Sequence, residues 1–183
     1  MPNRLVGVVV SCLGFVISIP GISGAQSAGS EGVRAELFVS TALGVVFHGT
    51  DDDIPVRPNI GGGVAVRPVP RVGVEFEVNQ NLGRSQRWGS VGVASANVLY
   101  FFAAERPRAY VSGGIGALWS DQAFFNPQTT TVEVRRATGL AWNIGLGVRI
   151  PIGRAISFRP EFRGYSNADL RIFRTSIAVG YHW

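Results

Sequence analysis

Apolar and polar side chains alternate position by position along most of this chain. The last segment shows the pattern most clearly, since its odd-numbered positions carry Phe173, Thr175, Ile177, Val179, Tyr181 and Trp183. Its even-numbered positions, from Arg174 to His182, are polar or small. Because a strand directs successive side chains to opposite faces, this alternation predicts a strand with one apolar and one polar face.

Eight segments of this kind follow one another, and no helical period interrupts them. They are residues 34–47, 59–67, 71–83, 90–102, 109–120, 139–152, 156–165 and 171–183. Most reach the roughly 9–11 residues that a tilted strand needs to cross a lipid bilayer. The pattern therefore predicts an all-β chain of eight antiparallel strands.

The connections between these segments differ in length. Residues 67–71, 103–108 and 153–155 are short turns, whereas 48–58 and 121–136 are longer and more polar, and 84–89 and 166–170 are intermediate. Short turns at one end and longer loops at the other are typical of an up-and-down transmembrane β-barrel with periplasmic turns and extracellular loops. An even number of strands places both termini of the barrel domain at the short-turn side.

Two features disturb the regular pattern. Pro160 lies inside a predicted strand and cannot donate to a hydrogen-bonded ladder, and Gly61–Gly63 weakens another strand. We expect a bulge or a bend near each of them.

The N-terminal region has the layout of a cleaved secretory signal peptide. Arg4 precedes an apolar run over residues 5–19, and Ser23-Gly24-Ala25 supplies a small-residue cleavage site. We expect a signal peptide over 1–25 and one barrel domain over 26–183. The only cysteine, Cys12, lies within the signal segment, so the mature chain is expected to have no disulfide or thiolate metal site.

Charge on the polar face of the strands indicates how the interior is filled. The face carries four acids and four bases by alternation: Glu36, Glu75, Glu77, Arg149, Arg159, Glu161, Arg163 and Arg174. Buried charges are costly unless they pair, and an eight-stranded barrel is just wide enough to be filled by its own side chains. The balance predicts a lumenal charge network that plugs the barrel, with a narrow ion path or a gate as the alternative. Arg57, Arg67 and Arg108 are assigned to loops and turns.

The sequence gives little indication of nucleic-acid binding, metal binding or catalysis. Arginines account for all 17 basic residues and are spread along the chain, which argues against a nucleic-acid partner. Asp51, Asp52 and Asp53 could make loop contacts, but they lack the spacing of a dedicated calcium loop. We predict no catalytic residue, no metal site and no cofactor, because His48 and His182 should lie at opposite ends of the barrel.

Several stretches carry a resemblance to a known family. They are Asn97-Val98-Leu99-Tyr100-Phe101-Phe102, Pro107-Arg108-Ala109-Tyr110-Val111-Ser112-Gly113-Gly114, Arg159-Pro160-Glu161-Phe162-Arg163 and Gly180-Tyr181-His182-Trp183. With them the mature chain resembles the small outer-membrane β-barrel proteins of the OmpA/OmpX type. The resemblance implies a monomer in the bacterial outer membrane, in contact with lipid and lipopolysaccharide. It also implies insertion by the barrel assembly machinery, which reads a C-terminal aromatic signature matched here by Tyr181 and Trp183.

The function that fits these expectations is a non-enzymatic barrel with an envelope-structural role or a surface-interaction role through its extracellular loops. Three alternatives remain: a small passive channel, a lipid A-modifying enzyme, and a soluble lipocalin-like binding barrel. In the last of these the apolar face would point inward. The alternation by itself does not say which face is inside.

Overall fold

The computed structural model describes residues 34–48, 56–82, 88–103, 107–126, 131–168 and 170–183. Its strands are β1 (Arg34–His48), β2 (Val56–Val69), β3 (Val72–Asn81), β4 (Trp88–Phe101), β5 (Arg108–Asn126), β6 (Thr131–Ile152), β7 (Ile156–Ser166) and β8 (Leu170–His182). The predicted signal peptide over 1–25 lies outside the described residues. Within these ranges the structure contains no helix long and apolar enough to cross a membrane.

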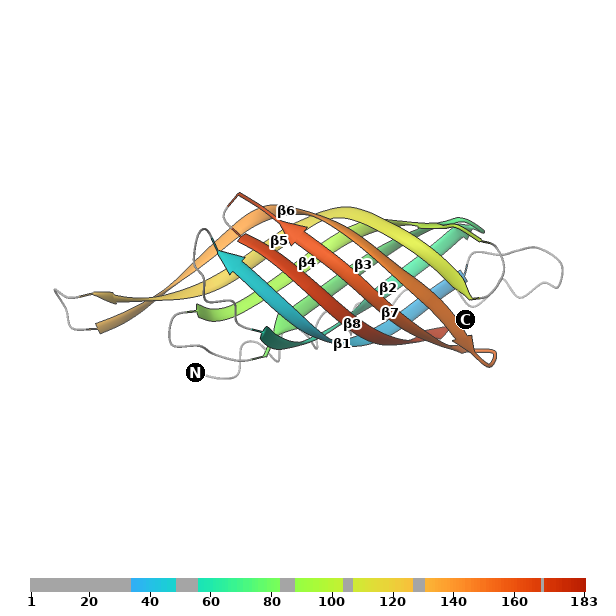
Figure 1. Cartoon of the computed structure of the whole chain (residues 1–183), viewed down its shortest axis with the longest axis horizontal. Helices are drawn as coiled ribbons and strands as arrows, with labels where there is room; N and C mark the ends of the chain where they lie inside the picture. The colour runs from blue at the N-terminus through green and yellow to red at the C-terminus, as the bar shows by residue number, and fades with distance from the viewer. Residues whose placement is uncertain (1–33, 49–55, 83–87, 104–106, 127–130, 169) are drawn as a thin grey trace, which may run out of the picture. The chain divides into compact units, whose positions relative to one another are not determined.

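The strands form a closed antiparallel barrel in which each strand pairs with its neighbours in chain order (Figure 1). β1 and β8 close it, in a register that runs from Glu36 opposite His182 to His48 opposite Leu170. The predicted eight-stranded up-and-down barrel is thus confirmed. We call the end that holds the start of β1 and the end of β8 the short-turn end, and the opposite end the loop end.

The apolar face of every strand points outward. Leu140 is 75% exposed and Ile115 61%, and the same face of β8 exposes Phe173, Ile177 and Val179. The charged face points into the lumen, where Glu75 and Arg163 have no exposed surface. This arrangement is wrong for a lipocalin-like barrel, which needs an apolar interior, and it is the one that a lipid surrounding requires.

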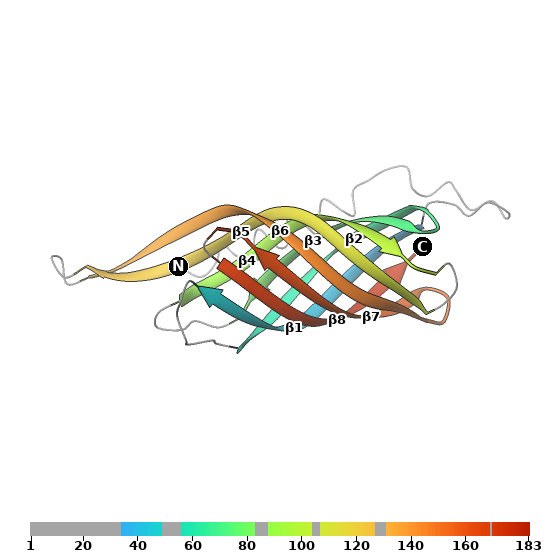
Figure 2. The same ribbon diagram turned by 45° about the horizontal axis from the view of Figure 1, so that its top comes forward.

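One predicted loop is largely strand. Residues 121–136 were expected to be a loop, but β5 continues to Asn126 and β6 begins at Thr131, so the two strands form a ribbon that projects beyond the barrel (Figure 2). Asp121 lies opposite Arg136, whose Nε donates to its carboxylate at 2.8 Å. That hydrogen bond and the negative charge of Asp121 raise the pKa of Arg136.

A bulge or a bend was expected near Gly61–Gly63 and near Pro160, and no bulge lies at either place, although the β6–β7 pairing omits Pro160. The β1–β2 and β2–β3 registers run unshifted through the glycines, and the β7–β8 register runs unshifted through Pro160. A Cβ on Gly61 or Gly63 would collide with β3, so these glycines allow close strand approach. The irregularities lie elsewhere, between Val66 and Val69 and between Trp88 and Val91.

Candidate functional site

The lumen brings together all eight charged side chains that alternation assigned to the polar face. β3, β7 and β8 supply most of the set, and β1 and β6 supply one residue each: Glu36, Glu75, Glu77, Arg149, Arg159, Glu161, Arg163 and Arg174. β3 stands across the barrel from β7 in the strand order. Ion pairs between these strands therefore connect opposite walls.

Two glutamates of β3 form the centre of this network. Glu75 accepts hydrogen bonds from Arg159 at 2.6 Å and from Arg163 at 2.8 Å. Glu77 accepts from Arg163 and Arg174, both at 2.7 Å. Each carboxylate oxygen thus has a guanidinium donor, which offsets the cost of removing the charges from water.

Glu161 joins the same network from β7. Its carboxylate lies 2.8 Å from Nε of Arg163 and 3.4 Å from the guanidinium of Arg174. The hydroxyl of Tyr110 donates to its other oxygen at 2.6 Å. The central part of the network therefore contains three glutamates and three arginines, and its net charge is zero.

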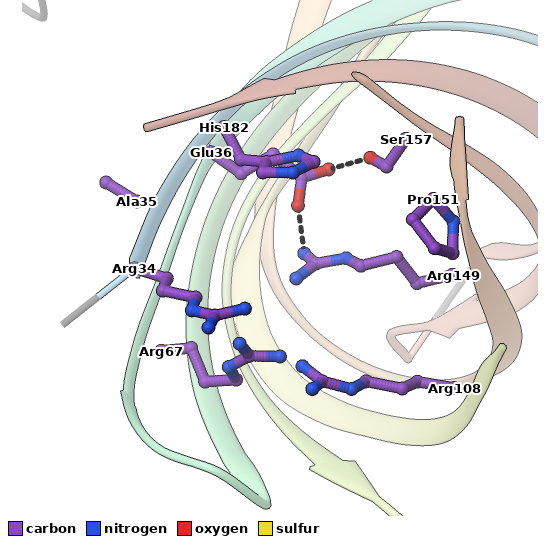
Figure 3. Close-up of a pocket in the computed structure, with 9 residues that line it drawn as sticks. All are labelled: Arg34, Ala35, Glu36, Arg67, Arg108, Arg149, Pro151, Ser157 and His182. Atoms are coloured by element: carbon purple, nitrogen blue, oxygen red, sulfur yellow. Dashed lines mark hydrogen bonds and ion pairs between the residues drawn. The ribbon is translucent and has the colours of Figure 1, made fainter. Parts of the chain in front are cut away.

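Glu36 lies apart from this centre, toward the short-turn end. It pairs with Arg149, and Ser157 donates to its second oxygen at 2.9 Å (Figure 3). Arg159, at 3.9 Å, links Glu36 weakly to the rest of the network. The guanidinium of Arg159 lies 4.5 Å from the centroid of the Phe38 ring, a cation–π distance.

Asparagines extend the polar layer toward the loop end. Asn59 donates to Asn81 at 2.5 Å, and Asn143 donates to Asn97 at 2.8 Å. Asn97 in turn donates to Glu75 at 3.3 Å. These asparagines were not predicted as interior residues, although their strand parity, which they share with the glutamates, would have placed them inside.

Apolar side chains close the lumen on both sides of the charged layer. Toward the loop end they form a buried cluster: Val91, Val93, Leu118, Ala141, Tyr165, Leu170 and Ile172. Toward the short-turn end Leu99, Phe101 and Tyr110 form a second cluster. Neither was predicted. The cavities found among the described residues that line the lumen are small, at about 30 Å³, 10 Å³ and 10 Å³.

The interior contains more arginine than the sequence analysis predicted. Arg57, Arg67 and Arg108 were assigned to loops and turns, but they lie within strands and are buried. Among the described residues, seven lumenal arginines therefore face four lumenal glutamates. Arg57 and Arg108 were assigned wrongly because β2 and β5 begin before the predicted strands, whereas Arg67 was counted with the turn although it is the last residue of the predicted strand 59–67.

The remaining predicted site residues lie outside the lumen or outside the described part of the chain. Tyr181 and Trp183 are exposed on the outer surface, with stacked rings 6.1 Å apart. Asp51, Asp52 and Asp53 lie outside the described residues, as does the side chain of His48. His182 lines the cavity at the short-turn end. No group of His, Cys, Asp and Glu among the described residues could hold a metal ion.

Comparisons with known proteins support the fold. No protein-family model matches the sequence, and no curated protein is significantly similar to it. Among solved structures, Neisserial surface protein A matches with a TM-score of 0.65 at 12% identity, over 82% of this chain and 99% of that chain. Ail, the attachment invasion locus protein of Yersinia pestis, matches with 0.62 at 14%, over 83% and 99%.

A third similar structure is the N-terminal β-barrel domain of Pseudomonas aeruginosa OprF, with a TM-score of 0.55 at 14% identity, over 80% of this chain and 97% of that chain. Identities this low show a common fold. An outer surface that is apolar around the whole barrel, enclosing a charged interior, is stable only in lipid. The protein is a small transmembrane β-barrel with the fold that these bacterial proteins share.

Proposed function

We propose that this protein is a non-conducting, non-enzymatic barrel that contributes to the structure of the outer membrane and presents the β5–β6 ribbon for interaction at the cell surface. The observation that carries the proposal is the network of Glu75, Glu77 and Glu161 with their arginines, which fills the lumen from wall to wall. Buried carboxylates enclosed by arginines offer neither a path for ions nor access for a substrate.

The ribbon supports the interaction role. Residues 123–126 of β5 pair with 131–134 of β6, while the pairing of β4 with β5 ends at Gln122 and that of β7 with β6 ends at Trp142. Within the described strands, both outer edges of the ribbon therefore lack a neighbouring strand. Unpaired strand edges are the element to which an extended segment of a partner adds by β-augmentation.

We do not propose that this chain binds a sulfated glycan. Ail was crystallised with a heparin analogue, sucrose octasulfate. The ribbon of this chain balances Arg135 and Arg136 with Asp121 and Glu133, and Arg136 is already paired with Asp121. A polyanionic glycan needs an excess of positive charge, so we propose a protein segment as the ribbon's partner.

The proposal also includes partners in the membrane. Lipid and lipopolysaccharide would surround the apolar outer surface, and the barrel assembly machinery would insert the chain as a monomer. The outward-facing pair of Tyr181 and Trp183 at the end of β8 supports recognition of the last strand during insertion.

Conductance across a planar lipid bilayer tests the closed interior. We expect the purified full chain to insert without stepwise ion currents, because the charged layer and the two apolar clusters leave no continuous water path. A porin added to the same bilayer serves as the positive control. Regular current steps from the purified wild-type chain would contradict the proposal and favour the passive channel.

A further inference from the structure

The β5–β6 ribbon is joined to neighbouring strands unequally on its two sides. β4 pairs with β5 as far as Trp88 opposite Gln122, whereas β7 pairs with β6 only as far as Ser166 opposite Trp142. Residues 131–141 of β6 therefore have no neighbouring strand on the β7 side within the described strands. Among these strands, the support for the ribbon comes from β4.

The backbone pairing with β4 is itself irregular at this level. The β4–β5 register shifts between Trp88 and Val91, just where the ribbon leaves the barrel. A shifted register disrupts the ladder locally, so fewer backbone hydrogen bonds hold the two strands at a fixed angle. Side-chain contacts at this point should therefore have more influence on the direction of the ribbon than similar contacts within the barrel wall.

Asp121 makes such contacts, because its carboxylate joins three neighbouring strands. Its Oδ2 accepts a hydrogen bond from the hydroxyl of Ser90 on β4 at 2.7 Å. Its Oδ1 accepts from Nε of Arg136 on β6 at 2.8 Å, and Nη2 of the same guanidinium donates to Oδ2 at 3.3 Å. We call Ser90, Asp121 and Arg136 the ribbon staple.

The ribbon staple is more than an ion pair at the surface. Two exposed ionic side chains stabilise a protein little, and Arg136 is 61% exposed, but Asp121 is only 17% exposed. The carboxylate also accepts from Ser90, and hydrogen bonds to charged groups are stronger than neutral ones.

A second contact fixes β5 to β4 on the same face. Trp119 lies two residues before Asp121, and a Cβ at Gly92 of β4 would collide with its indole ring. The glycine therefore lets the ring lie close against β4. The outer face of β5 is thus attached to β4 at two successive outward positions, at the base of the ribbon.

We propose that Asp121 is a positioning residue, which holds the ribbon in one orientation so that an extended protein segment can pair with its edge. An element that is ordered in advance binds without the entropy cost of ordering it on association. The inference rests on the interaction role proposed for the ribbon, and it adds the residue that orders the ribbon before a partner arrives.

Hydrogen–deuterium exchange of the folded full chain in lipid nanodiscs, followed by mass spectrometry of peptic peptides, tests the proposal without a partner. Loss of the staple should loosen both the junction with β4 and the pairing of β5 with β6, so ribbon amides should exchange faster. We expect Asp121→Ala to speed exchange over residues 122–135 about tenfold, as for the loss of one hydrogen bond to a charged group. Exchange in β8 should not change.

Further variants separate the contacts of the staple. Ser90→Ala removes one donor and should give a smaller increase in the same peptides. The charge-reversed double variant Asp121→Arg/Arg136→Asp rebuilds the ion pair and should bring ribbon exchange back toward the wild-type rate. The matched control is Thr138→Ala, which removes an exposed side chain from the same face of β6 and should exchange like the wild type.

Arg136→Gln keeps the test informative if Asp121→Ala fails to show the heat-dependent gel shift of a folded barrel. Its side chain is largely exposed, so the barrel should fold, and exchange in the ribbon should rise while exchange in β8 stays the same.

Three results would overturn the proposal. They are unchanged ribbon exchange in both Asp121→Ala and Arg136→Gln, an equal rise in the ribbon and in β8, and a charge-reversed variant that exchanges as fast as the single variants. The surface role of the ribbon would survive each of them, because a loose ribbon can still become ordered on contact with a partner. Accessibility of the ribbon in intact cells tests that role separately.

Discussion

Arg163 joins three glutamates of the network through one side chain. Its guanidinium contacts Glu77 at 2.7 Å and both Glu75 and Glu161 at 2.8 Å, and none of its surface is exposed. Arginine presents five donors in a fixed fork, whereas lysine presents one compact ammonium group. Three carboxylates on two opposite walls therefore require arginine at this position.

Removing one acid from this network should leave two arginines short of a partner. We expect Glu75→Ala to lower the free energy of unfolding by about 3–5 kcal/mol, the range for breaking a buried ion pair. Glu75→Gln keeps the shape and one acceptor and should lose less. Urea unfolding in detergent micelles, followed by tryptophan fluorescence, measures both.

Arg71→Ala is the matched control for this experiment, because its side chain is exposed in a turn. It should change stability by no more than about 0.5 kcal/mol. Equal stability of Glu75→Ala and the wild type would show that the buried ion pairs do not stabilise the barrel.

Alternation was sufficient to assign the lumenal face of the eight charged residues, because parity depends only on the strand period. Alternation did not predict which glutamate pairs with which arginine. That pairing depends on the stagger of the strands around the barrel, and the sequence of one strand does not contain this information. Arg57 and Arg108 were missed for a related reason, since predicted strand ends that are one or a few residues too short assign inward side chains to loops and turns.

Among the strands, the β5–β6 ribbon is the feature that the sequence pattern did not predict. Alternation arises where one face of a strand meets lipid and the other meets the lumen. A ribbon beyond the barrel lies outside this contrast between lipid and lumen, so alternation does not mark its strands. The pairing from Asp121 opposite Arg136 to Asn126 opposite Thr131 became evident only in the structure.

Trypsin treatment of intact cells tests where the ribbon lies. Trypsin should cut after Arg135 or Arg136 in whole cells, because the ribbon projects from the loop end. Arg71 and Arg154, exposed in turns at the short-turn end, should be cut only after the outer membrane is opened. Fragment masses identify each cut.

The double variant Arg135→Gln/Arg136→Gln is the control, and it should lose the ribbon fragment while it keeps the heat-dependent gel shift of the barrel. Cleavage after Arg71 in intact cells, with protection of the ribbon, would mean that the barrel has the opposite orientation or that the ribbon is not at the surface.

The whole molecule separates two environments by a single layer of backbone. Outward side chains on β6 are apolar through the barrel, from Leu140 to Ile152, and inward ones are small or polar. The sequence predicted the strands and their two faces, and the balanced charge of the polar face predicted that this face lines the lumen. Burial confirms it, because the charged side chains are enclosed and the apolar side chains are exposed.

A charge on the outer surface should therefore cost most near the middle of the barrel. We expect Ile144→Arg to lower the free energy of unfolding in lipid bilayers by about 2–4 kcal/mol, the range for arginine at the bilayer midplane. Thr138→Arg, on the same face of β6 but at the base of the ribbon, should cost about 1 kcal/mol or less.

Urea titration of the two variants in the same bilayers, read from heat-dependent gel migration, gives the comparison. Equal costs for Ile144→Arg and Thr138→Arg would mean that the membrane does not cover the middle of the barrel.

The pairing of β1 with β8 also has a consequence for the order of folding. Seven of the eight strand contacts join neighbours in the chain, whereas Glu36 and His182 are 182 − 36 = 146 residues apart. Bringing such distant segments together costs about 4 kcal/mol of chain entropy before any contact compensates for it. Hairpins of neighbouring strands can form early, but the barrel closes only after the last strand has been synthesised. Until then the edge of β1 that later pairs with β8 can pair with a strand of another protein.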